Sequence, residues 1–246
     1  MHTQTAIRTG SIRNPVLAPR HCAPAVAAHV ASVASHLHVV ATDSDALDQA
    51  MRMMGGLIAY PRNSEIFGEN EPADYLYKVV SGSVRTYKIL GDGRRQIGGF
   101  YLPGDVFGLE FTDEHTLSAE AIADAKVLVV KRSAIDALSG RDAAVARQLF
   151  NLTGRELCRV QDRILLLIKS AQERVASFLL EMAERASGGK AIELPMSRQD
   201  IADYLGLTIE TVSRTLTVLE ETAAIEVPTA RRIVLRDRPA LSRMNG

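Results

Sequence analysis

Three side chains near the C-terminus carry groups that can read DNA bases: a carboxylate on Glu210, a hydroxyl on Ser213 and a guanidinium on Arg214. Spacings of three and four residues bring them to one side of a helix. An arginine can donate two hydrogen bonds to guanine, a carboxylate can accept one from cytosine N4, and a serine can contact thymine or phosphate. Taken singly, Glu210 could instead stabilise a helix dipole, and Arg214 could be a solvated charge. Because all three occur together, we interpret them as base-reading residues.

Residues 197–221 predict two short helices that would position these groups. Ser197 followed by Asp200 is typical of a helix N-cap. Gly206 breaks this first helix in a tight turn, and Thr208 caps the second. Leu207 is expected to fill the corner between the two helices, and apolar residues at core spacing line their inner faces: Ile201, Ala202, Leu205, Val212, Leu216 and Leu219. Two helices around such a turn form a helix-turn-helix, whose second helix enters the major groove of double-stranded DNA.

A hairpin is expected after these helices. Apolar runs at 225–228 and 233–235 flank Thr229-Ala230-Arg231-Arg232, so the turn would place two arginines beside the DNA backbone. Contacts to phosphate position a protein on DNA without adding sequence information. The expected backbone contacts are Thr208, Thr211, Thr217, Arg198, Arg231 and Arg232.

The first half of the chain has a different character. From residue 50 to 131, apolar runs of five to seven residues alternate with Gly, Pro and Asp, which predicts a β-barrel or β-roll. Residues 142–169 form one long amphipathic helix with a phase slip in its apolar stripe. We favour a homodimer through this helix over packing on its own barrel alone. The expected dimer residues are Leu149, Leu152, Val160, Ile164 and Leu167.

The fold class is therefore α+β, in four parts. Residues 1–49 form an irregular N-terminal extension, 50–140 a β-roll, 141–169 the dimerisation helix and 170–246 a winged helix-turn-helix domain. The first 42 residues contain no Asp or Glu and hold five of the six histidines. This composition also resembles a transit peptide, but we favour an irregular N-terminal extension. The histidines lack the tight spacing of a metal site, so none is predicted.

Bulk composition sets limits on the function. The chain has 29 Lys and Arg against 29 Asp and Glu, so attraction to DNA must come from local clusters such as Arg231, Arg232, Arg236 and Arg238. No apolar run is long enough to span a membrane. Two cysteines, Cys22 and Cys158, fit a reducing environment, and a cytoplasmic location is expected.

Residues 197–216, SRQDIADYLGLTIETVSRTL, and residues 75–108, YLYKVVSGSVRTYKILGDGRRQIGGFYLPGDVFG, resemble the CRP/FNR superfamily of transcription regulators, and the first stretch is very similar to FixK-type members. The resemblance implies a cyclic-nucleotide-binding-like β-roll and a recognition pattern E-x-x-S-R on Glu210, Ser213 and Arg214. It further implies a TTGAT-N4-ATCAA-type palindrome, recruitment of RNA polymerase as an activator, and control of microaerobic or anaerobic respiration and nitrogen fixation.

The effectors of that superfamily can be compared with the residues here. A [4Fe–4S] cluster needs four ligands, usually thiolates, and two cysteines are too few. By resemblance, cyclic AMP requires a Glu, which Glu110 loosely matches, and an Arg-Ser pair, which here reads Leu117-Ser118. Without that arginine the cyclic phosphate loses a bidentate partner, so no cyclic AMP and no other cofactor is expected. His115 is expected to be solvated rather than a haem ligand.

Cys158 lies on the predicted long helix. We favour a small buried apolar residue there; the alternative is a redox-sensitive thiol near the dimer contact. No Ser/His/Asp, metal or phosphate-loop arrangement indicates an enzyme. The remaining alternative is a regulator whose β-roll binds an unidentified small molecule that controls DNA binding.

Overall fold

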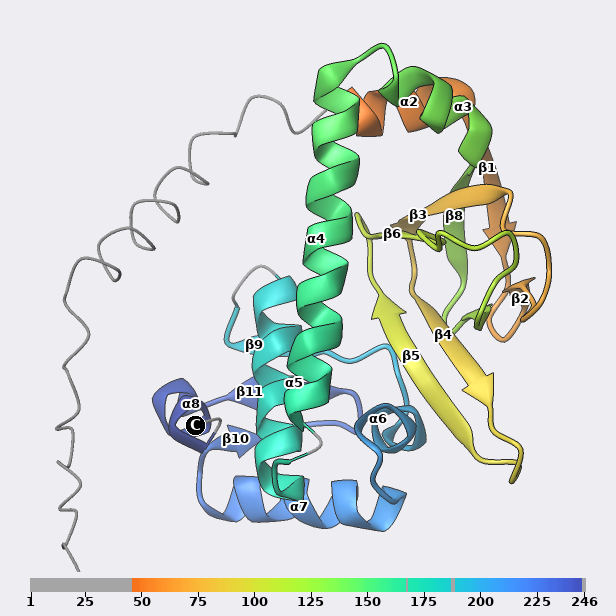
Figure 1. Ribbon diagram of the computed structural model, residues 1–246. Helices are drawn as coiled ribbons and strands as arrows, with labels where there is room; N and C mark the ends of the chain where they lie inside the picture. Colours follow the sequence, from red (N-terminus) through yellow and green to blue (C-terminus); the bar gives the residue numbers. More distant parts are fainter. Residues whose placement is uncertain (1–45, 167, 187–188, 245–246) are drawn as a thin grey trace, which may run out of the picture. The chain divides into compact units, whose positions relative to one another are not determined.

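The computed structural model describes residues 46–166, 168–186 and 189–244 (Figure 1). The histidines of the N-terminal extension, Cys22 and Leu167 fall outside the described residues. Along the described chain, a β-rich half precedes a mostly helical half, which confirms the predicted α+β class. No described helix has both the length and the apolar content to cross a bilayer.

Two four-stranded antiparallel sheets form the β-roll. One has the strand order β1-β8-β3-β6 and the other β2-β7-β4-β5. Val79, Val84 and Val127 are fully buried between them, because alternate residues of each strand point to the same face. The strands are β1 (Gly56–Tyr60), β2 (Glu65–Phe67), β3 (Tyr75–Ser81), β4 (Val84–Ile89), β5 (Arg95–Tyr101), β6 (Val106–Phe107), β7 (Ser118–Ala121) and β8 (Ala125–Lys131).

The connection from β3 to β4 requires a glycine. Gly82 has φ +78°, and a Cβ atom there would lie 2.2 Å from the carbonyl oxygen of Asp124. Both the backbone angle and the close approach exclude a larger residue. This turn sends the chain from one sheet of the roll into the other.

Two short helices cover the end of the roll. Helix α2 (Ala46–Met54) begins inside the segment that we expected to be irregular, and α3 (Arg132–Ser139) follows β8 directly. Leu47 and Met51 of α2 pack with Ile135 of α3 in one buried cluster. The spacing of Leu47, Ala50, Met51 and Met54 was a helical signal available in the sequence.

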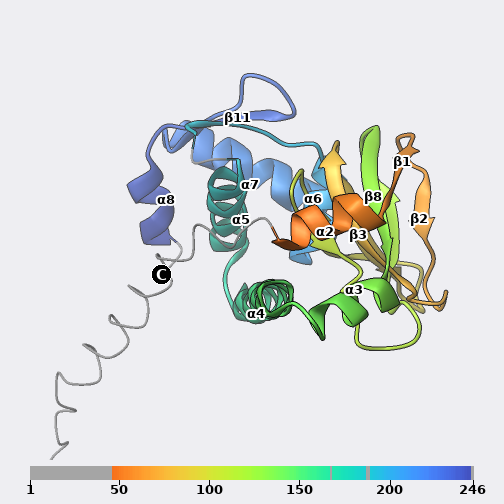
Figure 2. The same cartoon turned by 90° about the horizontal axis from the view of Figure 1, so that it is seen from above.

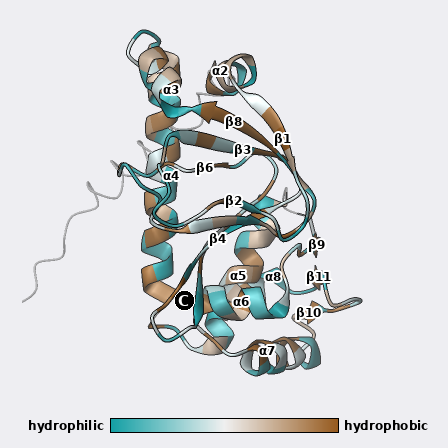
Figure 3. Ribbon diagram, turned by 90° about the vertical axis from the view of Figure 1, so that its right-hand side faces the viewer, coloured by the Kyte–Doolittle hydropathy of each residue, from teal (hydrophilic) through white to brown (hydrophobic). Residues whose placement is uncertain are grey.

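Helix α4 (Ala143–Leu166) is seen end-on in Figure 2, and Figure 3 shows both hydrophobic and hydrophilic residues along it. Its apolar residues lie on two different faces. Val145 is buried, and Leu149 and Leu152 pack on the cluster that α2 and α3 form with the roll. These two leucines therefore contact their own subunit, and both remain partly exposed. The phase slip seen in the sequence marks the change of face. The exposed apolar residues of this region are Phe150, Leu157, Val160, Ile164, Leu165 and, just beyond the helix, Ile168.

The C-terminal part is a helical core with a small sheet. Its elements are α5 (Ala171–Arg185), β9 (Ala191–Glu193), α6 (Arg198–Leu205), α7 (Ile209–Glu221), β10 (Ile225–Glu226), β11 (Arg232–Leu235) and α8 (Arg238–Met244). The predicted hairpin is present as β10 and β11, and β9, which we had not predicted, completes the sheet order β10-β11-β9. Ile97 and Phe100 of β5 belong to the same buried cluster as the core of this part.

Candidate nucleic-acid interface

The two helices α6 and α7 and the turn between them form as the sequence predicted. Ser197 and Asp200 make a reciprocal capping box at the start of α6, and Gly206 ends that helix with φ 65° and ψ 40°. The Thr208 side chain accepts a hydrogen bond from the backbone N–H of Thr211 and caps α7. Each boundary is thus fixed by a local interaction, so the angle between the helices is built into residues 197–211.

Helix α7 buries one face and exposes the other. Val212, Leu216 and Leu219 are buried against the domain core. Glu210, Ser213 and Arg214 are exposed on the remaining surface. The three sequence-predicted groups therefore lie within five consecutive residues of one helix, and all three are exposed.

Glu210 is held in its charged form. Hydrogen bonds from its own backbone N–H and from the Thr208 side chain keep its pKa below 4.5, and Arg214 acts in the same direction. This is the behaviour expected of a carboxylate in the first turn of a helix. At neutral pH the group can accept, and cannot donate, a hydrogen bond.

Four of the predicted backbone contacts lie at the start of α6 or on and next to α7. Thr208 and Thr217 are exposed, while Thr211 is partly covered. Arg198, at the start of α6, is half-buried, and burial lowers its pKa, opposed by Glu220. It lines a groove of about 220 Å³ beside α7, together with Ser213, Leu216, Thr217, Glu220 and Val227.

The arginines of the predicted basic cluster differ in their surroundings. Arg231 is exposed in the turn before β11, and Arg232 is exposed as the first residue of that strand, with its Nε 3.8 Å from a Glu193 carboxylate oxygen. Arg236 pairs with Glu226, and Arg238 pairs with Glu184. Three of the four arginines thus lie within ion-pair distance of an acid of their own domain, and two of these, Arg236 and Arg238, donate hydrogen bonds to it. Of the four, Arg231 in the turn has no such acid.

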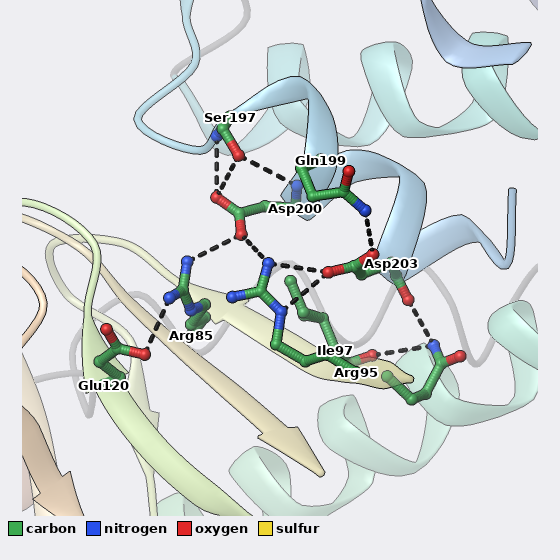
Figure 4. A network of polar contacts seen from close by, with 9 residues as sticks. Arg85, Arg95, Ile97, Glu120, Ser197, Gln199, Asp200 and Asp203 are labelled. Atoms are coloured by element: carbon green, nitrogen blue, oxygen red, sulfur yellow. Dashed lines mark hydrogen bonds and ion pairs between the residues drawn. The ribbon is translucent and has the colours of Figure 1, made fainter. Parts of the chain in front are cut away.

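Sequence reasoning missed the contacts that hold α6 against the roll (Figure 4). Asp200 Oδ1 accepts hydrogen bonds from Arg85 Nη1 of β4 and from Arg95 Nη2 of β5, each at 2.7 Å. Arg85 also donates to Glu120, and Arg95 Nε donates to Asp203. The Asp200 and Arg85 side chains are only 6% and 11% exposed. The two arginines are more than 100 residues from the α6 carboxylates that they contact, so no local pattern could have indicated these contacts.

Cys158 is exposed on α4, so the expectation that it is a buried apolar residue is wrong for the subunit. It follows Leu157, one of the exposed apolar residues of the same helix. Within the described residues, no group of three or more His, Cys, Asp or Glu side chains is placed to hold a metal ion.

Comparison with known proteins shows the family. A Crp-like helix-turn-helix domain matches residues 173–244, and a cyclic nucleotide-binding domain matches residues 57–142. The nitrogen fixation regulation protein FixK of Azorhizobium caulinodans is 50% identical over 213 residues, which cover 84% of this chain and 86% of that protein. The chain belongs to the CRP/FNR family. It is a transcription regulator with a helix-turn-helix DNA-binding domain, not an enzyme, as the sequence predicted.

Other CRP/FNR proteins support the assignment. The transcriptional activator protein anr of Pseudomonas aeruginosa is 35% identical over 196 residues, which cover 77% of this chain and 79% of that protein. The solved structure of FixK2 from Bradyrhizobium japonicum is 52% identical, with a TM-score of 0.75, and the match covers 78% of this chain and 98% of that chain. The predicted order of β-roll, long helix and winged helix-turn-helix is therefore that of a known FixK protein.

The residues in this CRP/FNR roll do not fit a cyclic phosphate. Leu117 stands where the resemblance requires an arginine, and the Ser118 hydroxyl accepts a hydrogen bond from the backbone N–H of Glu69 at 2.9 Å. Arg85, although it is on β4 of the roll, is committed to Asp200 and Glu120. The charge-assisted partners that such a ligand needs are absent among these side chains.

His115 is buried inside the roll, which corrects the expectation that it is solvated. Its ring stacks on Phe67 with a centroid distance of 3.6 Å. His115 Nδ1 lies 3.3 Å from Glu110 Oε1, although the geometry is not that of a hydrogen bond. Glu110, the remaining match to the nucleotide pattern, therefore faces a protein side chain.

Proposed function

We propose that this protein is a homodimeric transcription activator that binds a TTGAT-N4-ATCAA-type palindrome. The observation that carries the proposal is the joint exposure of Glu210, Ser213 and Arg214 on the outer face of α7. A carboxylate, a hydroxyl and a guanidinium at that place match the hydrogen-bonding groups at base edges in the major groove. Thr208, Thr211, Thr217, Arg198, Arg231 and Arg232 are the proposed contacts to the sugar-phosphate backbone.

The exposed face of α4 supports the homodimer. Phe150, Leu157 and Ile164 recur at intervals of seven residues and are 78%, 58% and 59% exposed. Apolar residues at this period are typical of a helix that packs along a second helix. Val160 extends the same stripe. A two-fold dimer would present its recognition helices about 34 Å apart, one turn of DNA.

The names of the relatives support a role in nitrogen fixation and in transcriptional activation. FixK of Azorhizobium caulinodans is described as a nitrogen fixation regulation protein and anr of Pseudomonas aeruginosa as a transcriptional activator. We therefore propose microaerobic or anaerobic respiration or nitrogen fixation as the regulon, cytoplasmic action, and recruitment of RNA polymerase.

The proposed activator needs no effector, and its activity is set by the amount of protein. The mismatch between the roll and a cyclic phosphate supports this proposal. Purified protein should activate transcription from a promoter with the palindrome when no small molecule is added. A strict requirement for an added small molecule would instead favour a ligand-gated regulator.

Selection of bound duplexes from a random DNA pool, at defined salt, tests the target directly. The expected product is a two-fold palindrome with the proposed half-sites. Repeating the selection with an oxidant examines the exposed Cys158. An asymmetric product, or no enrichment, would contradict the proposed function.

A further inference from the structure

Strand β5 joins the long helix α4 to the C-terminal part that contains the helix-turn-helix of α6 and α7, which we call the reading domain. Arg163 of α4 donates hydrogen bonds to the carbonyl oxygens of Ile97 and Gly98, the first at 2.9 Å. The same guanidinium lies over the Tyr204 ring of α6, 4.8 Å from its centroid. At the start of the strand, Arg95 contacts α6 through the carboxylates of Asp200 and Asp203. β5 thus connects α4, which carries the proposed dimer contact, to the helix-turn-helix.

The contact at Asp200 fixes the helix and not only a side chain. Asp200 Oδ2 accepts hydrogen bonds from the backbone N–H and the hydroxyl of Ser197, at 2.9 and 2.8 Å. Oδ1 accepts from Arg85 and Arg95. One oxygen of the Asp200 carboxylate caps α6 and the other binds the two arginines. Because both oxygens belong to one rigid group, a rotation that breaks the hydrogen bonds to the arginines also breaks the cap. A movement of α6 relative to the roll would break both ion pairs or the cap.

A further hydrogen bond holds the middle of the same helix. Gln96 Nε2 donates to the carbonyl oxygen of Asp203 at 2.8 Å. Together with Arg95, this contact restrains α6 at a second point, one turn after Asp200. Two points of attachment restrict rotation as well as translation. Since α6 and α7 share a buried core, the restraint extends to the recognition helix.

We infer that Arg85 and Arg95 are specificity-determining residues for the distance between the two half-sites. By locking α6 to β4 and β5, they hold each recognition helix at a fixed place relative to α4 and so relative to the partner subunit. The inference rests on the proposed palindrome-binding homodimer. It adds a determinant of DNA choice that lies far from the bases.

The physical reason is the geometry of DNA. Each extra base pair between the half-sites increases their separation by about 3.4 Å and rotates one half-site relative to the other by roughly a tenth of a turn. A rigid pair of reading domains therefore suits one spacing. Domains released from the roll reach several spacings, but they lose the preorganisation that favours the best one.

Binding of the full chain to palindromes with central spacers of two to six base pairs tests the inference. The Arg85→Gln/Arg95→Gln variant should bind the preferred spacer less tightly, and its advantage over spacers one base pair shorter or longer should shrink by roughly fivefold or more, the lower end of measured couplings between linked sites. Preference for the half-site bases should remain. Gln96→Leu, which keeps every ion pair, should change the spacer profile in the same direction but less.

Arg94→Gln is the matched control, because Arg94 is an exposed arginine of the same hairpin that pairs with Asp92. It should leave the spacer profile unchanged. If the wild type has a sharp spacer preference that neither the double variant nor Gln96→Leu alters, the inference is wrong while the proposed function stands. If the wild type binds no palindrome better than random DNA, the proposed function fails and the inference fails with it. Thermal unfolding of each variant identifies a loss of folding, and in that case Gln96→Leu decides the result.

Discussion

Arg214 is the side chain on α7 with the largest expected effect on base choice. Replacing it with Ala should weaken specific binding by about 1–3 kcal/mol and relax the preference at one guanine. Its guanidinium is exposed and no shift of the neighbouring core is needed to remove it. Competition binding with single-base variants of the palindrome measures both effects. An equal loss on random DNA would mean that Arg214 contacts the backbone.

Glu210 gives a prediction about pH. Because its pKa lies below 4.5, the carboxylate remains charged as the pH falls from about 8 to about 5.5, and any folded-state stability that its charge provides is lost only in more acidic solution. The difference in DNA affinity between the wild type and Glu210→Gln should therefore be constant across that range. Binding curves at several pH values, at fixed ionic strength, check this. A difference that fades toward pH 5.5 would require a raised pKa instead.

Single residues also show where sequence reasoning fails. Ser197, Gly206 and Thr208 were interpretable because each acts on residues two to four positions away. His115 was not, because its burial depends on Phe67, which lies on a distant strand. Cys158 is a small, often buried residue type, yet it lies on a helix face that its own subunit leaves open.

At the scale of elements, the turn before β11 should contribute affinity without sequence preference. The Arg231→Ala/Arg232→Ala variant should weaken binding to all DNA alike and lower the slope of log affinity against log salt by about two. The same substitution at Arg236 and Arg238, which donate hydrogen bonds to acids of their own domain, is the control and should change the slope less. A changed base preference would place the turn at base edges.

Elements whose own residues carry caps, turns and a regular apolar spacing could be predicted from the sequence. Elements that form only because they pack on or pair with distant segments could not. The helix-turn-helix and the hairpin carry their own caps, turns and apolar spacing. The short β9 has three residues and exists because it pairs with β11. Helix α4 was found as one helix, but only the packing of α2 and α3 on Leu149 and Leu152 shows that its apolar residues serve two surfaces.

For the whole molecule, the exposed face of α4 makes the oligomeric state testable. Leu157→Glu should weaken the dimer by about 2 kcal/mol or more, because a charge would be buried among Phe150, Ile164 and their counterparts. Sedimentation over a range of concentrations measures this. Arg155→Glu, at an exposed position of the same helix, is the control. An unchanged dissociation constant for Leu157→Glu would place the dimer contact elsewhere.

The apolar cluster shared by β5 and the reading domain has a thermodynamic consequence. Phe100 of the β-roll contacts both Phe178 and Tyr204 of the reading domain. Part of the apolar surface that folding buries is therefore shared by the two halves. Heating should therefore melt them together, in one calorimetric peak whose van't Hoff and calorimetric enthalpies agree. Phe100→Ala should split that peak or broaden it, since truncation of a buried phenyl ring typically costs about 3–5 kcal/mol. In a regulator built this way, a destabilising substitution in the β-roll makes unfolding of the DNA-binding half less cooperative, even when every residue that contacts bases is intact.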